Sequence, residues 1–335
     1  MNQYPPEWDM LEEEEQPVVE QEYVQPAPAP GPRRQVPPPR SRQAPPSRGS
    51  GNGLSKLSLV ISILALLLAG TALFLALKPE PEPEQPPEPP PVEEPVTFRF
   101  GDRVMTPLEG MPLNPYDRSA FGTDSGGRVT YEKDRTRART GVDVSAYQKE
   151  INWQAVAADG IDFAILRMGY RGYTEGGLFT DQYFEQNLRG AREAGLEIGI
   201  YFFSQAVTPE EAQAEAQYVL DALEGYDISY PVAFDWEPIS DAEARTAGLD
   251  GDTLTRCAAA FCEKVEQAGL RPAVYFNQTL GYLRYDLREL TGYDLWLAEY
   301  DSKPDFYYHF DLWQYTHTGQ VAGIEGDVDL DLDLR

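Results

Sequence analysis

The sequence has few cysteines, few histidines and a shortage of positive charge. Its 335 residues include 2 cysteines and 2 histidines, and 55 acidic residues stand against 28 basic ones, so the formal net charge is −27. The cysteines and histidines do not have the spacing of a zinc site or of a cysteine–histidine nucleophile. Phosphate recognition requires a basic surface, which a chain of this charge does not offer. Zinc-binding, thiol-dependent and nucleic-acid-binding classes are therefore disfavoured.

The two cysteines are expected to be free thiols. Cys257 and Cys262 lie five residues apart in a segment with a helical pattern. Five residues along a helix place side chains on different faces, which is unsuitable for a disulfide. We predict two buried, unpaired thiols.

Residues 1–53 have the composition of a disordered tail. An acidic run passes into a Pro-rich stretch with several arginines. Such a segment cannot bury enough apolar surface to offset its conformational entropy. We predict a disordered cytoplasmic tail, whose Pro-rich part either docks a partner as polyproline II or is passive.

An apolar run follows, and it is long enough to cross a membrane. Leu57–Leu77 contains no charge and is flanked by Lys56 and Lys78. About 20 helical residues span the hydrocarbon core, and this run is too long and too far from the N-terminus for a signal peptide. Basic residues precede it and glutamates follow it, which by the positive-inside rule orients the N-terminus to the cytoplasm. We predict a transmembrane helix over 54–78 with the rest of the chain outside.

Two segments connect this span to the main domain. Residues 79–96 alternate Pro and Glu, which predicts an extended linker. Residues 97–139 are rich in turns, and Thr97–Phe100 and Arg128–Tyr131 have the character of short strands. This second segment is either a small β-rich stalk or an N-terminal extension of the main domain.

Residues 140–335 alternate between strand and helix patterns. Such repeats imply parallel strands with right-handed crossovers, and the last three strands leave little room for helices. Eight strands in about 195 residues predict an α/β fold, a TIM-like (β/α)5(β)3 barrel. The predicted strands are Gly141–Ser145, Phe163–Tyr170, Glu197–Ser204, Pro231–Pro238, Pro272–Asn277, Asp294–Tyr300, Phe310–Tyr315 and Val328–Leu332. The predicted helices are Asn152–Asp159, Asp181–Ala194, Pro209–Leu223, Thr253–Ala268 and a stretch around Leu280–Leu290.

The fourth predicted strand ends in two acids. Asp235 and Glu237 are two residues apart, so they point to the same face. Repulsion between them drives their pKa values apart, which allows one carboxyl to act as a general acid while the other stays ionised. In barrels of this type the catalytic residues lie at the C-terminal ends of the strands. We predict a catalytic pair; two solvated acids at a strand end are the alternative.

Two further acids lie on terminal strands of the predicted barrel. Asp143 stands among apolar residues of the first strand, where an acid is costly unless it is paired or near the mouth; a capping or turn aspartate is the alternative. Asp329 belongs to a run in which every second residue from 327 to 333 is Asp. Three interpretations of this run stay open: a cation site, a frayed acidic C-terminus, or Asp329 alone reaching the pocket.

Aromatic residues gather near the ends of the predicted strands. Each could belong to the core, but their convergence with acids at one rim favours stacking against sugar rings. The candidate substrate-binding residues are Tyr170, Tyr201, Phe203, Tyr275, Trp296, Tyr300 and Trp313, with the adjacent Gln314.

Seven segments between 141 and about 332 resemble the lysozymes of glycoside hydrolase family 25. One departure is Asp331, where an Asn often follows in the family. The matching segments, in order, are Gly141–Ser145 with Gln148 and Ile151–Trp153, Phe163–Tyr170, Ala191–Tyr201, Phe234–Glu237, Leu295–Tyr300, Trp313–Tyr315 and Asp327–Leu330.

The resemblance implies an enzyme that cleaves the β-1,4 bond between N-acetylmuramic acid and N-acetylglucosamine in peptidoglycan. It implies Glu237 as general acid/base, Asp235 as the group that orients or stabilises the intermediate, and Asp143 and Asp329 as the remaining acids of the pocket. Retention of configuration is expected, by a carboxylate nucleophile or by the substrate's N-acetyl group. No metal or cofactor is expected. An inactive wall-binding module and a glycosidase of another N-acetylated polymer such as chitin are the alternatives.

Overall fold

The structure is a computed structural model that describes residues 96–335. The tail, the transmembrane helix and nearly all of the linker predicted from the sequence lie outside these residues. None of the helices within 96–335 combines the length and the apolar character that a membrane crossing requires.

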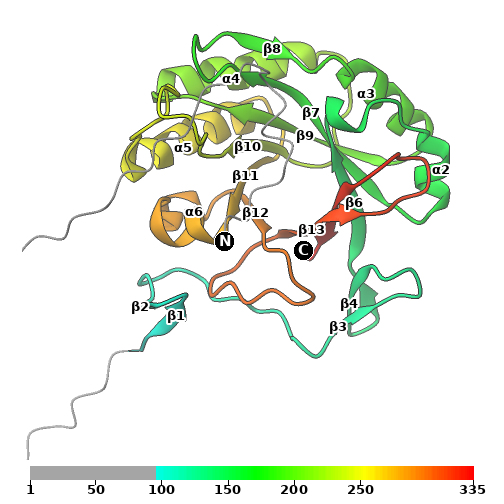
Figure 1. The fold of residues 1–335 in the computed structure, drawn as a ribbon, viewed down its shortest axis with the longest axis horizontal. Coiled ribbons are helices and arrows are strands. Elements are labelled where there is room, and N and C mark those ends of the chain that lie inside the picture. Colours follow the sequence, from blue (N-terminus) through cyan, green and yellow to red (C-terminus); the bar gives the residue numbers. More distant parts are fainter. Residues whose placement is uncertain (1–95) are drawn as a thin grey trace, which may run out of the picture. The chain divides into compact units, whose positions relative to one another are not determined.

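Eight strands close into a barrel (Figure 1). Each barrel strand pairs with the next barrel strand along the chain, and β6 (Arg139–Val144) pairs with both β7 (Phe163–Arg171) and the last strand, which closes the barrel. The other barrel strands are β9 (Glu197–Ser204), β10 (Val232–Trp236), β11 (Pro272–Asn277), β12 (Asp294–Ala298), β13 (Leu312–Gly319) and β14 (Val328–Asp333).

Helices cover the outside of the first five strands. They are α2 (Trp153–Ala158), α3 (Phe184–Glu193), α4 (Pro209–Ala222), α5 (Gly251–Gln267) and α6 (Gln278–Leu283), with 3-10 helices at Ala146–Gln148 and Leu287–Leu290. Side-chain caps begin several of them; Thr208, for example, accepts the Glu211 N–H at the start of α4. Both cysteines lie on the buried side of α5 as free thiols, as predicted.

The predicted strand order is confirmed, but the prediction that all strands run parallel is wrong for the last one. β14 runs antiparallel to both β13 and β6. Only residues 320–327 separate β13 from β14, and a parallel crossover requires about a dozen residues or more. The start of β14 therefore lies at the same end of the barrel as the C-terminal ends of the other strands. The sequence also gave no signal for β8 (Leu178–Thr180), which pairs with the end of β7.

The barrel interior below its mouth is filled with side chains from alternate strand positions. Phe163 stacks on Tyr230 with 4.3 Å between ring centroids. The backbone of β6 passes so close to this ring that a Cβ atom on Gly141 would lie 2.1 Å from it. Glycine is therefore required at this position, two residues before Asp143.

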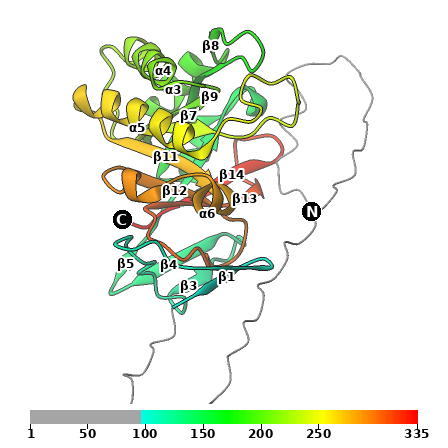
Figure 2. The ribbon, with the colours of Figure 1, turned by 90° about the vertical axis from the view of Figure 1, so that its left-hand side faces the viewer.

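Residues 97–139 form small strands that pack on the barrel. These strands are β1 (Phe98–Phe100), β2 (Arg103–Met105), β3 (Phe121–Thr123), β4 (Val129–Lys133) and β5 (Thr136–Arg137). They lie on the side of the barrel away from α3, α4 and α5 (Figure 2). Phe121 meets Trp313 edge-on at 5.4 Å, and Tyr116 packs against Phe310. The segment, called the N-terminal extension below, covers strands that lack helices of their own.

We expect Phe121→Ala to destabilise the protein by about 3–5 kcal/mol, the usual cost of truncating a buried phenylalanine. The measurement is the free energy of urea-induced unfolding. Val104→Ala on β2 is the matched control, because Val104 is 62 % exposed and its truncation should change stability by less than about 0.5 kcal/mol. Equal stability of the two variants would show that the extension does not contribute to the folded core.

Candidate active site

The four predicted acids lie together in a pocket at the mouth of the barrel. The cavity has a volume of about 220 Å³, and Asp143, Asp235, Glu237 and Asp329 all line it. Their side chains are between 5 and 7 % exposed. The pair Asp235 and Glu237 shares one face, as the two-residue spacing predicted, and a solvated strand end is excluded.

The strand register explains how the acids meet. Asp143 on β6 lies directly opposite Asp329 on β14. Opposite residues of an antiparallel pair have Cβ atoms about 4.5–5.5 Å apart, and like charges there destabilise the sheet. Asp235 on β10 contributes from across the barrel, in register with Phe203 and Tyr275. The pairing of Asp143 with Asp329 lowers stability, and a feature that costs stability in this way is expected at a functional site.

A glutamine connects two tyrosines to one of the acids. The Oε1 atom of Gln314 accepts hydrogen bonds from the hydroxyls of Tyr275 and Tyr300, each at 2.9 Å. Its Nε2 atom is then left to donate to Asp143, at 2.8 Å. Burial, followed by the negative charge of the pocket acids, raises the pKa of both tyrosines, so their hydroxyls remain donors. This orientation of the amide fixes Asp143 as an acceptor.

The alternating aspartates of β14 have separate roles. Asp329 lines the pocket, whereas Asp331 is fully buried below it and accepts the indole N–H of Trp296 at 2.8 Å. Asp333 at the base accepts from Tyr230 and pairs with Arg335. Among the described residues, no group of three or more His, Cys, Asp or Glu is arranged to hold a metal ion. Of the three interpretations of this run, Asp329 alone reaching the pocket fits the structure.

Burial favours the neutral form of Asp331 in the folded protein. Burial raises its pKa well above the usual range, the nearby charge of Asp143 raises it further, and the Trp296 hydrogen bond opposes the shift. A protonated carboxyl has the shape of a carboxamide. A neutral Asp331 can therefore occupy a position where an Asn often stands in the family that the sequence resembles.

Six of the eight predicted substrate-binding residues line the pocket, and two do not. The prediction for Trp313 is wrong, because successive side chains of β13 point to opposite faces and Gln314 points into the pocket. Trp313 therefore points outward, where it is fully buried against the extension and donates to the Glu299 carbonyl. Tyr170 stacks instead on Phe179 of β8 beside the pocket. The six that line the pocket are Tyr201, Phe203, Tyr275, Trp296, Tyr300 and Gln314.

The structure adds residues that the sequence did not single out. Arg167 on β7 is the one basic side chain among the described residues of the pocket lining, and it pairs with Asp181 at 2.8 Å. A charged residue in the otherwise apolar middle of a strand was the available signal. The other additions lie in short connections without a periodic pattern, after β6 and before α3: Ser145, Ala146, Tyr147 and Gln182.

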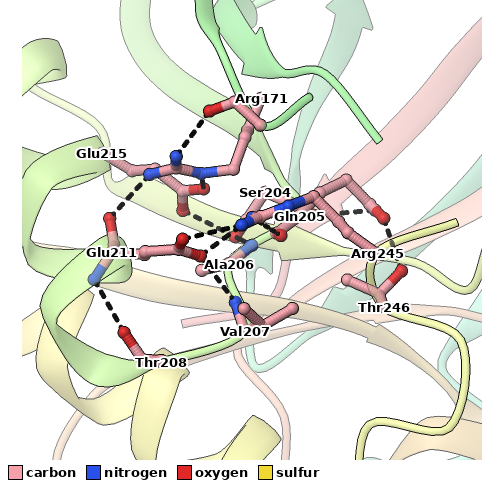
Figure 3. A network of polar contacts seen from close by, with 11 residues as sticks. Arg171, Ser204, Gln205, Ala206, Val207, Thr208, Glu211, Glu215, Arg245 and Thr246 are labelled. Atoms are coloured by element: carbon pink, nitrogen blue, oxygen red, sulfur yellow. Dashed lines mark hydrogen bonds and ion pairs between the residues drawn. The ribbon is translucent and has the colours of Figure 1, made fainter. Parts of the chain in front are cut away.

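Gln205, Arg245 and Thr246 belong to a polar network that also includes residues of α4 (Figure 3). One of its hydrogen bonds holds the backbone of Glu237. Gln205, just after β9, donates through Nε2 to the Glu237 carbonyl at 3.0 Å. Its Oε1 atom accepts from the Thr246 hydroxyl at 2.7 Å, and its own carbonyl accepts from Arg245 at 2.7 Å. The loop after β10 is thereby tied to the residue that follows β9 at two places, at Glu237 and at Arg245–Thr246.

The same network extends to α4 and β7. Arg245 forms two hydrogen bonds with Glu211, and Arg171 pairs with the fully buried Glu215 at 2.6 Å. Ser204 also donates to Glu215, yet burial raises the pKa of Glu215 to about 7. These contacts make the floor behind Glu237 rigid, because each buried charge has a partner.

Comparison with known proteins identifies the domain. The sequence pattern of the glycosyl hydrolases family 25 matches residues 142–324. The chain belongs to this family. The matched region contains three of the four pocket acids, and Asp329 lies just beyond it.

Two curated relatives are lysozymes. The autolytic lysozyme of Clostridium acetobutylicum is 29 % identical over 194 residues, which cover 57 % of this chain and 54 % of the relative. Lysozyme M1 of Streptomyces globisporus is 26 % identical over 232 residues, 66 % of this chain and 72 % of the relative. The match therefore spans about half the length of the Clostridium protein.

Solved structures share the fold. A family 25 glycosyl hydrolase from Bacillus anthracis superposes with a TM-score of 0.52 at 22 % identity, covering 64 % of this chain and 95 % of that one. The modular autolysin LytC of Streptococcus pneumoniae superposes with a TM-score of 0.52 at 22 % identity, covering 66 % and 57 %. The barrel assignment agrees with both.

The raised pKa of Asp331 should make the free energy of unfolding depend on pH. Because its pKa is higher in the folded than in the unfolded state, ionisation destabilises the fold as the pH rises above about 4. Asp331→Asn removes this penalty, so its stability relative to the parent should rise with pH, by at most about 1.4 kcal/mol per pH unit. Urea unfolding between pH 4.5 and 8 measures the difference, with Asp221→Asn on the exposed side of α4 as control. Parallel stability curves for parent and Asp331→Asn would contradict a neutral Asp331.

Proposed function

We propose that this protein is a muramidase that hydrolyses the β-1,4 bond between N-acetylmuramic acid and N-acetylglucosamine in peptidoglycan. The observation behind the proposal is the gathering of four carboxylates in one aromatic-walled pocket of a family 25 barrel. Relatives named lysozyme support the choice of bond and polymer. Aromatic walls with few charges besides the acids suit a sugar, whose ring faces are apolar and whose edges are polar.

In the proposed mechanism Glu237 is the general acid/base. It follows β10 directly, its backbone carbonyl is held by Gln205, and its side chain lines the pocket. It would protonate the glycosidic oxygen as the bond breaks and later deprotonate the attacking water. The first step requires the protonated carboxyl and the second step the carboxylate.

The remaining acids would stabilise positive charge on the sugar. An oxocarbenium-like transition state develops a positive charge at the anomeric carbon, and preorganised carboxylates in a water-poor pocket favour it. Asp235 is the candidate to orient or stabilise the intermediate. We propose retention of configuration, with the attack made by a carboxylate or by the substrate's own N-acetyl group.

We also propose that the domain is tethered outside the cell membrane. The support is in the sequence alone: the apolar run Leu57–Leu77, its flanking charges and the Pro/Glu linker. An extended linker of about 18 residues at roughly 3.1 Å each would reach some 55 Å from the membrane. An enzyme held at that distance is suited to remodelling the cell's own wall.

Glu237→Gln tests the catalytic assignment. The variant should fold normally and lose hydrolysis by about 10²–10⁴-fold or more, because the amide cannot donate an acidic proton. The assay is release of reducing ends from purified peptidoglycan, followed by borohydride reduction and mass spectrometry. Muramitol ends are expected. Glucosaminitol ends would show that the enzyme cleaves the other glycosidic bond of peptidoglycan. Products from chitin alone would show that peptidoglycan is not its substrate.

The control for this substitution is Glu243→Gln. Glu243 is exposed and lies on the same loop after β10, but it does not line the pocket. It should keep full activity. Undiminished hydrolysis by Glu237→Gln would remove this residue from the acid role, and peptidoglycan binding without hydrolysis by the parent would indicate a binding module.

Deletion of residues 57–77 tests the tether. The parent chain should remain in the membrane fraction after carbonate extraction, and a C-terminal tag should be accessible to protease added to spheroplasts. The deletion variant should be recovered without membranes. A tag protected from protease until the cells are lysed would contradict the proposed orientation.

A further inference from the structure

A second hollow continues from the catalytic pocket along the N-terminal extension. It has a volume of about 510 Å³ and is lined by the β3–β4 hairpin on one side and by the end of β13 on the other. Tyr300 lines both this groove and the catalytic pocket, so the two hollows adjoin at this side chain. The hairpin precedes residue 142, outside the part of the chain that the family pattern matches.

The catalytic pocket alone is too small to hold a polymer. Ligand clefts commonly measure about 300–1,000 Å³, whereas the pocket with the four acids measures about 220 Å³. It accommodates the sugars at the scissile bond and little more. A glycan strand must continue beyond it, and the groove begins at the shared Tyr300.

The hairpin wall is held in place from both sides. Within its turn, Asp124 Oδ1 accepts the backbone N–H of Gly126 and of Arg128. Arg128 in turn pairs with Asp159 and donates to the Gln320 carbonyl. A wall fixed before the ligand arrives loses little entropy on binding.

The chemistry of the groove suits a neutral sugar. Its polar lining consists largely of hydroxyls, including those of Thr123, Ser302 and Thr316. The one carboxylate of this lining, Asp301, accepts hydrogen bonds from the backbone N–H and the hydroxyl of Ser302. The Arg128 guanidinium is already neutralised by Asp159 and is not available for a carboxylate. His317 packs on Tyr300 at 4.6 Å between ring centroids. Hydroxyls beside an aromatic plane match the hydroxyl and N-acetyl groups of an amino sugar.

We propose that this groove is an extended glycan subsite, built by the N-terminal extension, that binds sugars of the peptidoglycan strand beyond those at the cleaved bond. The proposal rests on the muramidase function proposed above. It assigns the extension a role in selecting long strands over short fragments.

Thr123→Trp fills the groove and His317→Ala removes one of its walls. Tyr300 is left unchanged because it also lines the catalytic pocket. Full-length parent and variants are assayed on peptide-free glycan strands of graded length. Both substitutions should lower kcat/KM at least fivefold more on long strands than on the shortest strand that the parent cleaves.

Glu132→Trp is the matched control, since Glu132 is exposed on β4 of the same hairpin but does not line the groove. It should match the parent on every strand. A length-independent loss in the groove variants, or no loss at all, would overturn the subsite while leaving the muramidase function intact. A loss seen only with peptide-bearing strands would identify the stem peptide as occupant and also overturn it.

Binding separates failure of the subsite from failure of the function. The dissociation constants of long and short strands are measured for Glu237→Gln with and without Thr123→Trp. The additional substitution should weaken binding of long strands at least fivefold and of short strands less. If the parent hydrolyses no strand, the proposed function fails, and the groove is still supported or overturned by this comparison.

Discussion

The structure around the pocket depends on one constraint, which is the repulsion between four acidic side chains that are buried close together. Asp143 and Asp329 face each other across paired strands, with Asp235 and Glu237 lining the same cavity. Burying one such carboxylate without partners is costly, and four repel one another. Hydrogen-bond donors and a positive charge around the pocket offset this repulsion. Gln314 is oriented by two tyrosines so that it donates to Asp143, and Arg167 is the basic residue of the pocket lining. One layer below, burial and the nearby charge of Asp143 raise the pKa of Asp331, which favours its neutral form.

The antiparallel last strand makes this arrangement possible. A parallel β14 would begin at the opposite end of the barrel, and Asp329 would lie far from the pocket. Because only eight residues, 320–327, connect β13 to β14, the chain reverses and delivers the start of β14 to the catalytic end. The same shortness leaves no helix outside the last strands. The N-terminal extension fills that space through Phe121 and Tyr116, which links the extension to the stability of the domain and to the wall of the groove.

Rigidity behind Glu237 comes from charge pairs that never touch the pocket. The network through Gln205, Arg245 and Glu211 joins β9, α4 and the loop after β10, and Arg171 with Glu215 closes it at the end of β7. Buried ion pairs of this kind contribute little net stability but fix one geometry over others. A general acid needs its proton directed at one oxygen, so a fixed backbone at Glu237 serves the chemistry more than the fold.

The sequence by itself determined the barrel, its strand order and the positions of Asp143, Asp235 and Glu237, because period-two alternation and strand–helix repeats are local properties of the chain. Tertiary structure decided what depends on contacts between distant segments. Trp313 and Gln314 are neighbours on one strand, so only one of them can face the pocket, and the tertiary structure shows that it is Gln314. The packing of Tyr170 on Phe179 of β8 is likewise visible only in the folded chain. The raised pKa of Asp331 follows from burial beside Asp143, which lies 188 residues away in the chain.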